Sequence, residues 1–428
     1  MYDERRGTIA DCLALIRSGD TIWCSNNYNE PSTLLSHLHE IADRVEDIFV
    51  YKSRINRYPF MVTPGMNGHI NFGNYFYGPA YQEAHRLLNC TFIPVDLPNY
   101  YRQASLHKPW DIFMAQVSPM TEDGCFHIGM NQTFESELVA DALAGHKTII
   151  LEVNPNLTWM NGSVSIPVQA VTRLIEVDSP EDMTAPIVCT QDEINIGQMA
   201  ADIIEDGDTI QMGIGGIPNA IGEFLADKHD LGLHTEQFTS SMATLIEAGV
   251  ITGARKAFDK GEHVGVFADG THELYKYLHD NPKCVLKPGA EVVNPFNIAR
   301  QDHMVSINTC IEMDLTGQVC AESIGPRQYS GSGGGFCFAL GAYYAEHGKG
   351  ILAFTSRTKK GVPKIRAQLA PGAIVTHPRN YIDYVITEYG AVRLKGTSVK
   401  ERAQLLISVA HPDDRAELTK AARELFYF

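Results

Sequence analysis

The chain has 428 residues, of which 44% are hydrophobic and 20% charged, and its formal net charge is −16 at pH 7. This length exceeds what one hydrophobic core usually organises, so we expect two domains. The acidic excess argues against a nucleic-acid partner, because binding to phosphates needs a surplus of lysine and arginine. It does not exclude small anionic substrates, which are held by local positive fields.

The cysteines and the N-terminus indicate an intracellular protein. The nine cysteines are widely spread, and no two stand in CxxC spacing. Such a set is typical of free thiols in a reducing cytoplasm rather than of disulfides or a zinc site. The first residues form a charged helix pattern without the apolar stretch of a signal peptide. No apolar run approaches the roughly 18 residues of a transmembrane helix, so we expect no membrane partner.

The tetrapeptide GDTI occurs twice, at residues 19–22 and 207–210. A helical pattern precedes each copy, and before the second copy apolar residues recur with the spacing of one helix face. Each copy predicts a turn and a strand, then a polar or glycine-rich loop and a helix with an early proline, Pro31 or Pro218. This repeated order predicts two halves of similar architecture. Four matching residues by themselves would also fit coincidence.

Runs of β-branched residues predict buried strands that alternate with helices such as residues 135–144, a pattern typical of the α/β class with parallel sheets. In the first half the predicted strands are 48–53, 91–97, 110–118, 147–154 and 171–178. In the second half they are 207–214, 263–268, 293–295, 304–309, 350–354 and 384–387. The C-terminal stretch 398–428 is predicted to be mainly helical, with a break at residues 410–414.

The segment 178–193 is acidic, contains two prolines and shows no periodicity. We interpret it as a linker between the two halves. The predicted domains are therefore residues 1–185 and residues 186–428.

The stretch GIGGIPNAIGEFLA, residues 213–226, follows a predicted strand and opens a helix. Glycines let a ligand approach the backbone, and a helix N-terminus offers N–H groups to an anion. The stretch is not a dinucleotide fingerprint, because Pro218 stands where GxGxxG needs glycine, and no Gly-Lys-Ser/Thr of a Walker loop follows. A Rossmann dehydrogenase is therefore disfavoured. A tight turn without a ligand also fits these residues.

A second glycine-rich stretch, YSGSGGGFCFALGAYY, covers residues 329–344. So many glycines cost backbone entropy, which indicates that something approaches the backbone closely. The GxSxG elbow of esterases is absent because Ser330 occupies its first glycine position, so Ser332 is not expected to be a nucleophile. No HExxH is present, and the pair His37 and His39 has no further ligand pattern, so we expect no metal.

Several stretches, in order along nearly the whole chain, resemble the acetyl-CoA hydrolase/transferase family of class I CoA-transferases, in particular the 4-hydroxybutyrate and butyryl-CoA:acetate CoA-transferase type. They are QVSPMTEDGCFHIG (116–129), LEVNPN (151–156), GIGGIPNAIG (213–222), LGLHTEQF (231–238), DLTGQVCAESIG (314–325), SGSGGGFCFALGA (330–342), YVITEYGAVRLKGTS (384–398) and SVAHPDDR (408–415). The resemblance implies two similar open α/β domains with mainly parallel sheets and an active site between them. It also implies that the second half carries the catalytic glutamate and the glycine loops.

The family's catalytic glutamate falls on Glu236, in the His-Thr-Glu stretch. The resemblance implies that this carboxylate attacks an acyl-CoA thioester and that the reaction passes through a glutamyl-CoA thioester with ping-pong kinetics. Without the resemblance, a glutamate among 51 acidic residues would be an ordinary surface residue. His234 would then either help to position Glu236 or have a structural role.

The resemblance also implies which residues contact CoA. The main loop corresponds to Gly213, Ile214, Gly215, Gly216 and Ile217. Further contacts correspond to Ile311, Gly334 and Lys360. Lys360 stands beside Arg357 and Lys359, a cluster that suits phosphate binding but is equally typical of a solvated basic turn. CoA enters as substrate, with no permanently bound cofactor, and the family suggests a cytoplasmic homodimer or higher homo-oligomer.

The sequence departs from the family pattern at two places. Relatives usually read Gly-Gly-Gln and an acid where this chain reads Gly334-Gly335-Phe336-Cys337, and they usually have asparagine at the position of Cys320. Both changes remove polar groups, so a branched or dicarboxylic acid, such as itaconate with succinyl-CoA as donor, remains an alternative to short monocarboxylic acids. Acyl-CoA hydrolysis and a non-catalytic acyl-CoA-binding protein also remain open.

Overall fold

A computed structural model describes residues 1–52, 66, 68–180, 183–184 and 187–428. The chain forms two compact units, residues 1–184 with 266–291 and residues 185–265 with 292–428. Residues 266–291 therefore pack with the first unit, although they follow part of the second unit in sequence. Positions 181–182 and 185–186 of the expected linker lie outside the described residues. The domain boundary expected at residue 185 stays a prediction.

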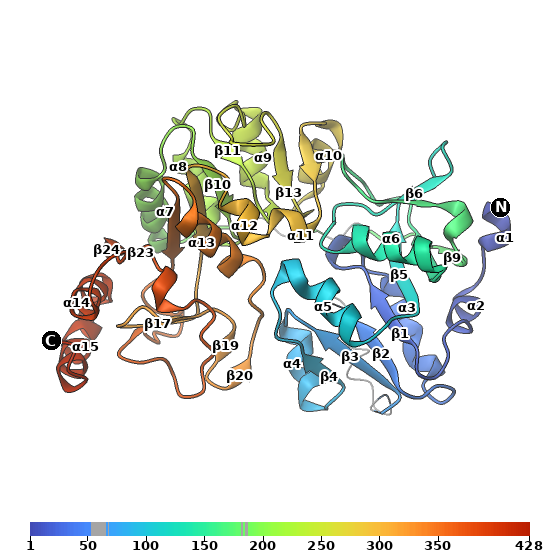
Figure 1. Cartoon of the computed structure of the whole chain (residues 1–428), viewed down its shortest axis with the longest axis horizontal. Coiled ribbons are helices and arrows are strands. Elements are labelled where there is room, and N and C mark those ends of the chain that lie inside the picture. Colours follow the sequence, from blue (N-terminus) through green and yellow to red (C-terminus); the bar gives the residue numbers. More distant parts are fainter. Residues whose placement is uncertain (53–65, 67, 181–182, 185–186) are drawn as a thin grey trace. The chain divides into compact units, whose positions relative to one another are not determined.

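The first unit is built on a seven-stranded sheet in the order β4-β3-β2-β1-β5-β7-β9 (Figure 1). Every pairing in this sheet is parallel. Its strands are β1 Thr21–Cys24, β2 Ile48–Tyr51, β3 Ile70–Asn74, β4 Cys90–Phe92, β5 Ile112–Val117, β7 Thr148–Val153 and β9 Arg173–Glu176. Shorter strands in this unit are β6 Cys125–His127, β8 Ser165–Pro167, β14 Phe267–Ala268 and β15 Cys284–Leu286.

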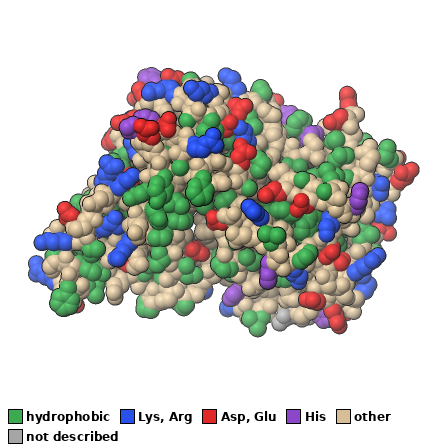
Figure 2. Space-filling view, in the orientation of Figure 1, with side chains coloured by type: hydrophobic (Ala, Val, Ile, Leu, Met, Phe, Trp, Pro, Cys, Tyr) green, Lys and Arg blue, Asp and Glu red, His purple; other side chains and the backbone are tan. Residues whose placement is uncertain are grey.

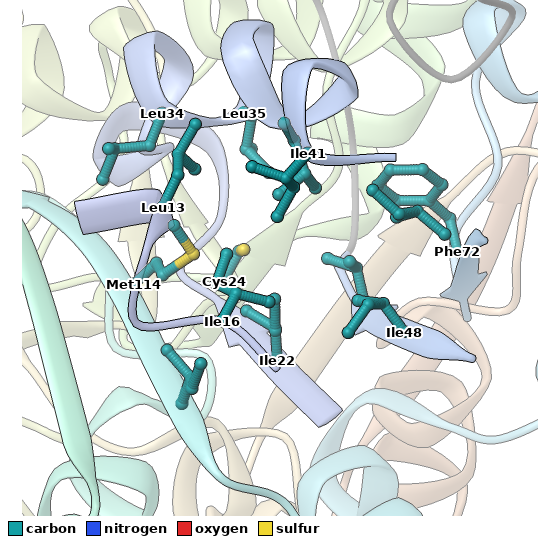
Figure 3. Packing of buried hydrophobic residues seen from close by; sticks show 14 of the residues in the cluster. Leu13, Ile16, Ile22, Cys24, Leu34, Leu35, Ile41, Ile48, Phe72 and Met114 are labelled. Carbon is teal, nitrogen blue, oxygen red and sulfur yellow. The ribbon is translucent and has the colours of Figure 1, made fainter. Parts of the chain in front are cut away.

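Helices cover this sheet because their apolar faces match its buried strands. Its α-helices are α1 Tyr2–Arg5, α2 Ile9–Leu13, α3 Ser32–His37, α4 Pro79–Arg86, α5 Tyr100–His107, α6 Glu135–Gly145 and α10 His272–Asp280, and α11 Gly289–Val292 ends at the boundary of the unit. Leu34 and Leu35 of α3 pack with Ile22 of β1 and Ile48 of β2 in one buried cluster (Figure 3). Burial of each such side chain stabilises the fold by about 1.5–3 kcal/mol.

The second unit is built on a six-stranded sheet in the order β11-β10-β16-β21-β23-β24. The pairings are parallel except that of the edge strand β24. Its strands are β10 Thr209–Met212, β11 Gly232–Leu233, β16 Met304–Asn308, β21 Lys349–Ala353, β23 Tyr384–Thr387 and β24 Gly390–Arg393. The α/β class with mainly parallel sheets, predicted from sequence, is confirmed.

The remaining elements of the second unit surround this sheet. The α-helices are α7 Gln191–Ile203, α8 Gly216–Phe224, α9 Ser240–Glu247, α12 Pro295–Ile298, α13 Gly335–Tyr344, α14 Val399–Val409 and α15 Pro412–Glu424. The short strands are β12 Gln237–Phe238, β13 His263–Gly265, β17 Glu312–Asp314, β18 Val319–Cys320, β19 Ser323–Ile324, β20 Arg327–Gln328 and β22 Ile365–Arg366. The predicted helical C-terminus and its break are confirmed by α14 and α15.

The two copies of GDTI form the same local structure. Gly19 and Gly207 both have a left-handed backbone, with φ of 84° and 85°. Asp20 and Asp208 each accept a hydrogen bond from the backbone N–H three residues earlier, at 2.7 and 2.8 Å. Each turn then enters the strand that starts its sheet, β1 or β10.

The order of strands repeats as well. In the first sheet the chain runs from β1 to β2 on one side and later adds β5, β7 and β9 on the other side. In the second sheet it runs from β10 to β11 on one side and later adds β16, β21 and β23 on the other. Both sheets therefore have a topological switch point beside the strand that follows GDTI, which supports a duplicated architecture.

Three strand predictions differ from the structure. Residues 293–295 do not form a strand, because the Asn294 side chain accepts a hydrogen bond from the Phe296 N–H at 3.0 Å and Pro295 begins helix α12. This N-cap and proline signature outweighs the two preceding valines. The strand predicted at 91–97 ends at Phe92, and the strand predicted at 263–268 divides into β13 and β14.

Two further features bear on the sequence expectations. Among the described residues, no helix is both long and apolar enough to cross a membrane. Each of the nine cysteines is a free thiol, and only Cys125 and Cys189 are not fully buried.

Substitution of the two turn glycines tests the duplicated turn. Gly19→Ala and Gly207→Ala should each lower the free energy of unfolding by about 1–2 kcal/mol, because alanine is strained at positive φ. Gly207→Ala should cost more, since its Cβ would lie 2.4 Å from the Arg255 guanidinium carbon, whereas nothing lies within 4 Å at Gly19. Urea unfolding measures both variants. Gly145→Ala, at the end of helix α6, serves as a control and should be neutral or slightly stabilising.

Candidate active site

The carboxyl ends of the parallel strands in the second unit gather most of the predicted site residues. The loop 213–217 follows β10, Glu236 follows β11, and Ile311 follows β16. Strands β10 and β16 are neighbours, and the chain leaves them toward opposite sides of the sheet. Crevices at such switch points are where open α/β sheets commonly bind ligands.

The carboxylate of Glu236 lies against the first turn of helix α13. Its Oε2 accepts a hydrogen bond from the Gly334 N–H at 2.9 Å. Burial raises the pKa of Glu236 to about 7, and the hydrogen bond from Gly334 opposes this rise by stabilising the ionised form. A carboxyl group with this pKa is partly ionised at neutral pH, as a nucleophile requires.

The contact with Glu236 explains why residue 334 is glycine. A Cβ added at Gly334 would lie 2.2 Å from Glu236 Oε2 and 2.7 Å from Val293 Cγ1. No side chain fits there unless the carboxylate moves. The glycine stretch thus allows a group to lie close to the backbone, as the sequence indicated. At Gly334 that group is the Glu236 carboxylate.

His234 is a fixed structural neighbour of Glu236. Its imidazole Nε2 lies 2.8 Å from the Val292 carbonyl oxygen, and the ring packs edge-on against Phe258 and Phe338. Its backbone N–H donates to the Ile210 carbonyl oxygen at 3.2 Å, which ties the segment to β10. The ring thereby anchors the Val292–Val293 backbone, and Val293 is the residue that flanks Gly334 beside the carboxylate.

The loop 213–217 has the geometry of a strand-to-helix turn open to a ligand. Gly213 N–H donates to the Ile307 carbonyl oxygen at 3.0 Å, and Gly215 has φ of 120° with nothing within 4 Å of an added Cβ. At Gly216 a Cβ would lie 2.3 Å from the Glu193 carboxylate, so a larger residue there would require that side chain to move. Ile214 is 51% exposed at the tip of the loop, whereas Ile217 is buried in the first turn of α8.

The structure fixes the positions of the other predicted CoA contacts, Ile311 and Lys360, less closely than that of the loop 213–217. Ile311 is half-buried, and its N–H donates to the Cys320 carbonyl oxygen at 2.9 Å. Lys360 is exposed in the loop after β21. Arg357, beside it in the basic cluster, forms a bidentate ion pair with Asp414, with N–O distances of 2.9 and 2.5 Å. Arg357 is therefore engaged within the protein.

The residues that depart from the family pattern are accommodated by packing. Phe336 lies against the rings of His377 and Tyr381, at centroid distances of 5.4 and 6.0 Å. Cys337 is buried. Cys320 is fully buried, and its thiol donates to the Ser323 carbonyl oxygen at 3.2 Å.

Sequence reasoning missed two polar residues of this region. Gln211 of β10 and Asn308 of β16 form a reciprocal amide pair, at 3.2 and 3.3 Å, beside Gly213 and Gly335. The available signal was a carboxamide near the end of each of two strands that are predicted to be buried.

One group of possible metal ligands occurs among the described residues, and it lies at the opposite edge of the sheet. Asp208 and His303 precede β10 and β16, and Glu205 lies beside them. The Lys349 ammonium already pairs with both carboxylates, at 2.9 Å to Glu205 and 3.0 Å to Asp208. The cluster thus contains its own cation.

Comparison with known proteins identifies relatives along the full chain. A model of the acetyl-CoA hydrolase/transferase C-terminal domain matches residues 270–422. A succinyl-CoA:cyclohexane-1-carboxylate CoA transferase of Geobacter metallireducens is 34% identical over 99% of this chain and 96% of its own length. A 4-hydroxybutyrate coenzyme A transferase of Clostridium kluyveri is 33% identical over 100% of this chain and 99% of its own length.

Solved structures agree with these relatives. The crystal structure of RipA from Yersinia pestis has a TM-score of 0.92 and 32% identity, and covers 100% of this chain and 99% of that one. The crystal structure of 4-hydroxybutyrate CoA-transferase from Porphyromonas gingivalis has a TM-score of 0.80 and 29% identity, with 99% of each chain covered.

The raised pKa of Glu236 predicts a pH-dependent stability. Since the folded-state pKa of about 7 exceeds the ordinary value of 4.5, the folded protein binds more protons than the unfolded chain between these values. The contribution of protonated Glu236 to the free energy of unfolding is therefore fully present below pH 4.5, and it is lost as the pH rises through 7. Glu236→Gln keeps the neutral form, so it should exceed the wild type by about 1–3 kcal/mol at pH 8.

Urea unfolding at pH 5 and pH 8 measures this difference. The exposed residue Glu424 supplies the matched control, because Glu424→Gln should change stability equally at both pH values. An advantage of Glu236→Gln that is the same at pH 5 and pH 8 would contradict the raised pKa.

Proposed function

The chain belongs to the acetyl-CoA hydrolase/transferase family, and on this basis we propose that it is an acyl-CoA:carboxylate CoA-transferase with Glu236 as its nucleophile. The observation that carries the proposal is the half-buried Glu236 carboxylate, held at 2.9 Å by the Gly334 N–H at the start of α13. The full-length relatives named as CoA-transferases support the reaction type.

The reaction begins with attack of a Glu236 carboxylate oxygen on the carbonyl carbon of an acyl-CoA. The bond from this carbon to sulfur breaks, which leaves a glutamyl–acyl anhydride and CoA thiolate. The thiolate then attacks the glutamyl carbonyl carbon and expels the acyl group as a free carboxylate. Glu236 now carries CoA as a thioester, so the energy of the original thioester is retained.

The second half-reaction reverses these steps with another acid. The incoming carboxylate attacks the glutamyl carbonyl carbon and releases CoA thiolate, which forms a new mixed anhydride. The thiolate then attacks the acyl carbon of that anhydride, and Glu236 leaves as a carboxylate. No external energy source is required, because each half-reaction replaces one thioester by another and one free carboxylate by another.

The Gly334 N–H suits the charge that develops when the glutamyl carbonyl is attacked. Each attack on the glutamyl carbonyl places negative charge on an oxygen attached to its carbon, and that carboxyl group lies against the N-terminus of α13. A backbone donor that is already oriented stabilises such an oxyanion without reorganisation. The positive end of the helix dipole acts in the same direction.

We further propose that CoA contacts Gly213, Ile214, Gly215, Gly216, Ile217, Ile311, Gly334 and Lys360. The open backbone at Gly215 and the N-terminal turn of α8 support an anion-binding role for the loop. The exposed Lys360 offers an ammonium that is able to reach a phosphate.

Short-chain carboxylic acids of the butyrate, acetate and 4-hydroxybutyrate type are the proposed substrates. Similar proteins are named for 4-hydroxybutyrate, for butyryl-CoA with acetate, and for succinyl-CoA with cyclohexane-1-carboxylate. More distant relatives are named acetyl-CoA hydrolase, at 27% and 22% identity, so water as acceptor is the competing outcome.

We propose a cytoplasmic homo-oligomer as the working form. The free thiols are consistent with a reducing compartment. On the second unit, hydrophobic side chains gather over α13 in Figure 2, and Tyr344 of α13 is 64% exposed, as Phe296 of α12 is 83% exposed. Exposed apolar groups of this kind are common at subunit contacts. Light scattering after gel filtration tests the assembly.

Mass spectrometry of the protein after incubation with an acyl-CoA tests the reaction directly. In the absence of an acceptor acid, the peptide that contains Glu236 should gain the mass of CoA minus water, because the half-reaction stops at the thioester. Acetyl-, butyryl- and succinyl-CoA are the donors to compare. Addition of acetate or butyrate should remove the adduct and form the corresponding acyl-CoA.

Glu236→Gln provides the control, because an amide is unable to act as this nucleophile and its peptide should stay unmodified. Release of CoA without an acceptor, at the same rate as with one, would instead establish a hydrolase. Binding of acyl-CoA with neither adduct nor CoA release would contradict an enzymatic role.

Gly334→Ala tests the contact between helix α13 and the nucleophile. The added Cβ would displace the carboxylate, so kcat should fall about 100-fold, the loss that a misplacement of about 1 Å can cause. Gly350→Ala is the matched control, because a Cβ there would meet only ordinary contacts at 3.7 and 3.9 Å. Steady-state kinetics with both variants would contradict this role if they lost activity equally.

A further inference from the structure

Asn308, the last residue of β16, lies at the junction of the two glycine loops of the second unit. Its Oδ1 would be 4.0 Å from a Cβ at Gly213 and 3.4 Å from a Cβ at Gly335. Its Nδ2 also lies 3.5 Å from the Gly335 carbonyl oxygen, a long contact that shares one of the two Nδ2 hydrogens with a shorter hydrogen bond. One carboxamide thus faces the loop proposed to hold CoA and contacts the helix start that holds Glu236.

A second carboxamide holds Asn308 in this orientation. Gln211 Nε2 donates to Asn308 Oδ1 at 3.3 Å, and Asn308 Nδ2 donates to Gln211 Oε1 at 3.2 Å and to Ser306 Oγ at 2.9 Å. Gln211 pairs with Ser306 across the parallel strands, and Asn308 is two residues further along β16. The three side chains therefore share one face of the sheet.

The burial of this cluster indicates a purpose beyond packing. Gln211 and Ser306 are at most 2% exposed. Buried polar groups must all be hydrogen-bonded to avoid a desolvation cost, and an apolar side chain would pack between sheet and helix without that requirement. A satisfied amide network in such a place gives a fixed geometry.

Glu236 and Asn308 contact two successive residues at the start of α13. Gly334 presents its N–H to Glu236 Oε2 at 2.9 Å, and Gly335 presents its carbonyl oxygen to Asn308. Both residues lack a Cβ, so each polar side chain contacts the backbone itself. With its carbonyl held by Asn308, the first turn of α13 has a defined position relative to β16, and the Gly334 N–H has a defined direction.

We propose that Asn308 is a positioning residue for CoA transfer: through its bonds to Gln211 and Gly335 it clamps the end of β10, where the Gly213 loop begins, to the first turn of α13, and so sets the place of the Glu236 carboxylate relative to bound CoA. This inference rests on the proposed function. Asn308 acts through Gln211, two residues before Gly213, and through the backbone of Gly334 and Gly335. Loss of the clamp should leave the groups that bind CoA present but misaligned with the nucleophile.

A split between kcat and KM distinguishes this role from general destabilisation. Asn308→Ala should slow formation of the Glu236–CoA adduct and lower kcat by about 10- to 100-fold, because alignment of reacting groups is lost. KM for acyl-CoA should change less than about threefold, since the binding contacts remain. Asn308→Asp keeps the size of the side chain but not its Nδ2 donor, so it should be impaired to a similar degree.

Gln301 supplies a matched control in the same unit. It is a buried carboxamide whose Oε1 accepts from the Ala257 N–H at 3.0 Å and whose Nε2 donates to the Phe258 carbonyl oxygen at 3.3 Å. Gln301→Ala should lower the unfolding midpoint as Asn308→Ala does, yet keep kcat within about threefold of the wild type. Urea unfolding of every variant accompanies the kinetics.

The outcomes separate the inference from the function on which it rests. Slow adduct formation in both Asn308 variants, with KM nearly unchanged and Gln301→Ala active, supports the clamp. Wild-type rates in Asn308→Ala or in Asn308→Asp overturn it, as does a kcat loss in Gln301→Ala that equals the loss in Asn308→Ala. If the wild-type protein forms no adduct with any donor, the proposed function fails first, and the clamp fails with it.

Discussion

The candidate site of the second unit depends on one contact, the hydrogen bond from the Gly334 N–H to the half-buried Glu236 carboxylate. Burial alone would keep this carboxyl group neutral, and its pKa of about 7 reflects the balance between desolvation and that single donor. The contact requires glycine at position 334, a helix that starts at residue 335, and a strand β11 that delivers Glu236 to the same edge of the sheet. A carboxyl group with a pKa of about 7 is partly ionised at neutral pH, which suits the nucleophilic role proposed for Glu236.

The duplicated architecture explains how the chain forms a candidate site at the carboxyl ends of its strands. A parallel sheet with a switch point brings two adjacent strand ends together while their loops leave in opposite directions, which opens a crevice there. Both units contain this arrangement beside their GDTI strand, but only the second has glycine loops at it. In the first unit, Ser25 follows the GDTI strand and donates to the buried Glu135 carboxylate at 2.8 Å. At this position the first unit thus has hydrogen-bonded polar side chains, whereas the second unit has glycine residues whose backbone a ligand is able to approach.

The glycines of the two loops have distinct physical roles. Gly215 is open and left-handed, Gly216 and Gly334 each exclude a Cβ because a carboxylate lies against them, and Gly335 adjoins Asn308. Glycine in these positions therefore serves approach by the protein's own side chains as well as by a ligand. The number of glycines in these loops indicates that some group lies close to the backbone, but it does not identify that group.

Local patterns in the sequence determined the α/β class, the two GDTI turns, the long strands and the C-terminal helices, because turn chemistry and the period of apolar residues act over a few residues. These patterns gave a wrong prediction at residues 293–295, where the Asn294 cap and Pro295 outweighed the preceding valines. They gave no indication of the pair formed by Gln211 and Asn308. Glu236 became a candidate only through resemblance to a family. Its hydrogen bond to Gly334 joins residues 98 positions apart, and the Asn308 side chain meets Gln211 of β10 and Gly335 of α13. Only the tertiary structure decided these contacts, because the register of parallel strands and the packing of α13 on the sheet determine which distant backbone and side-chain groups meet.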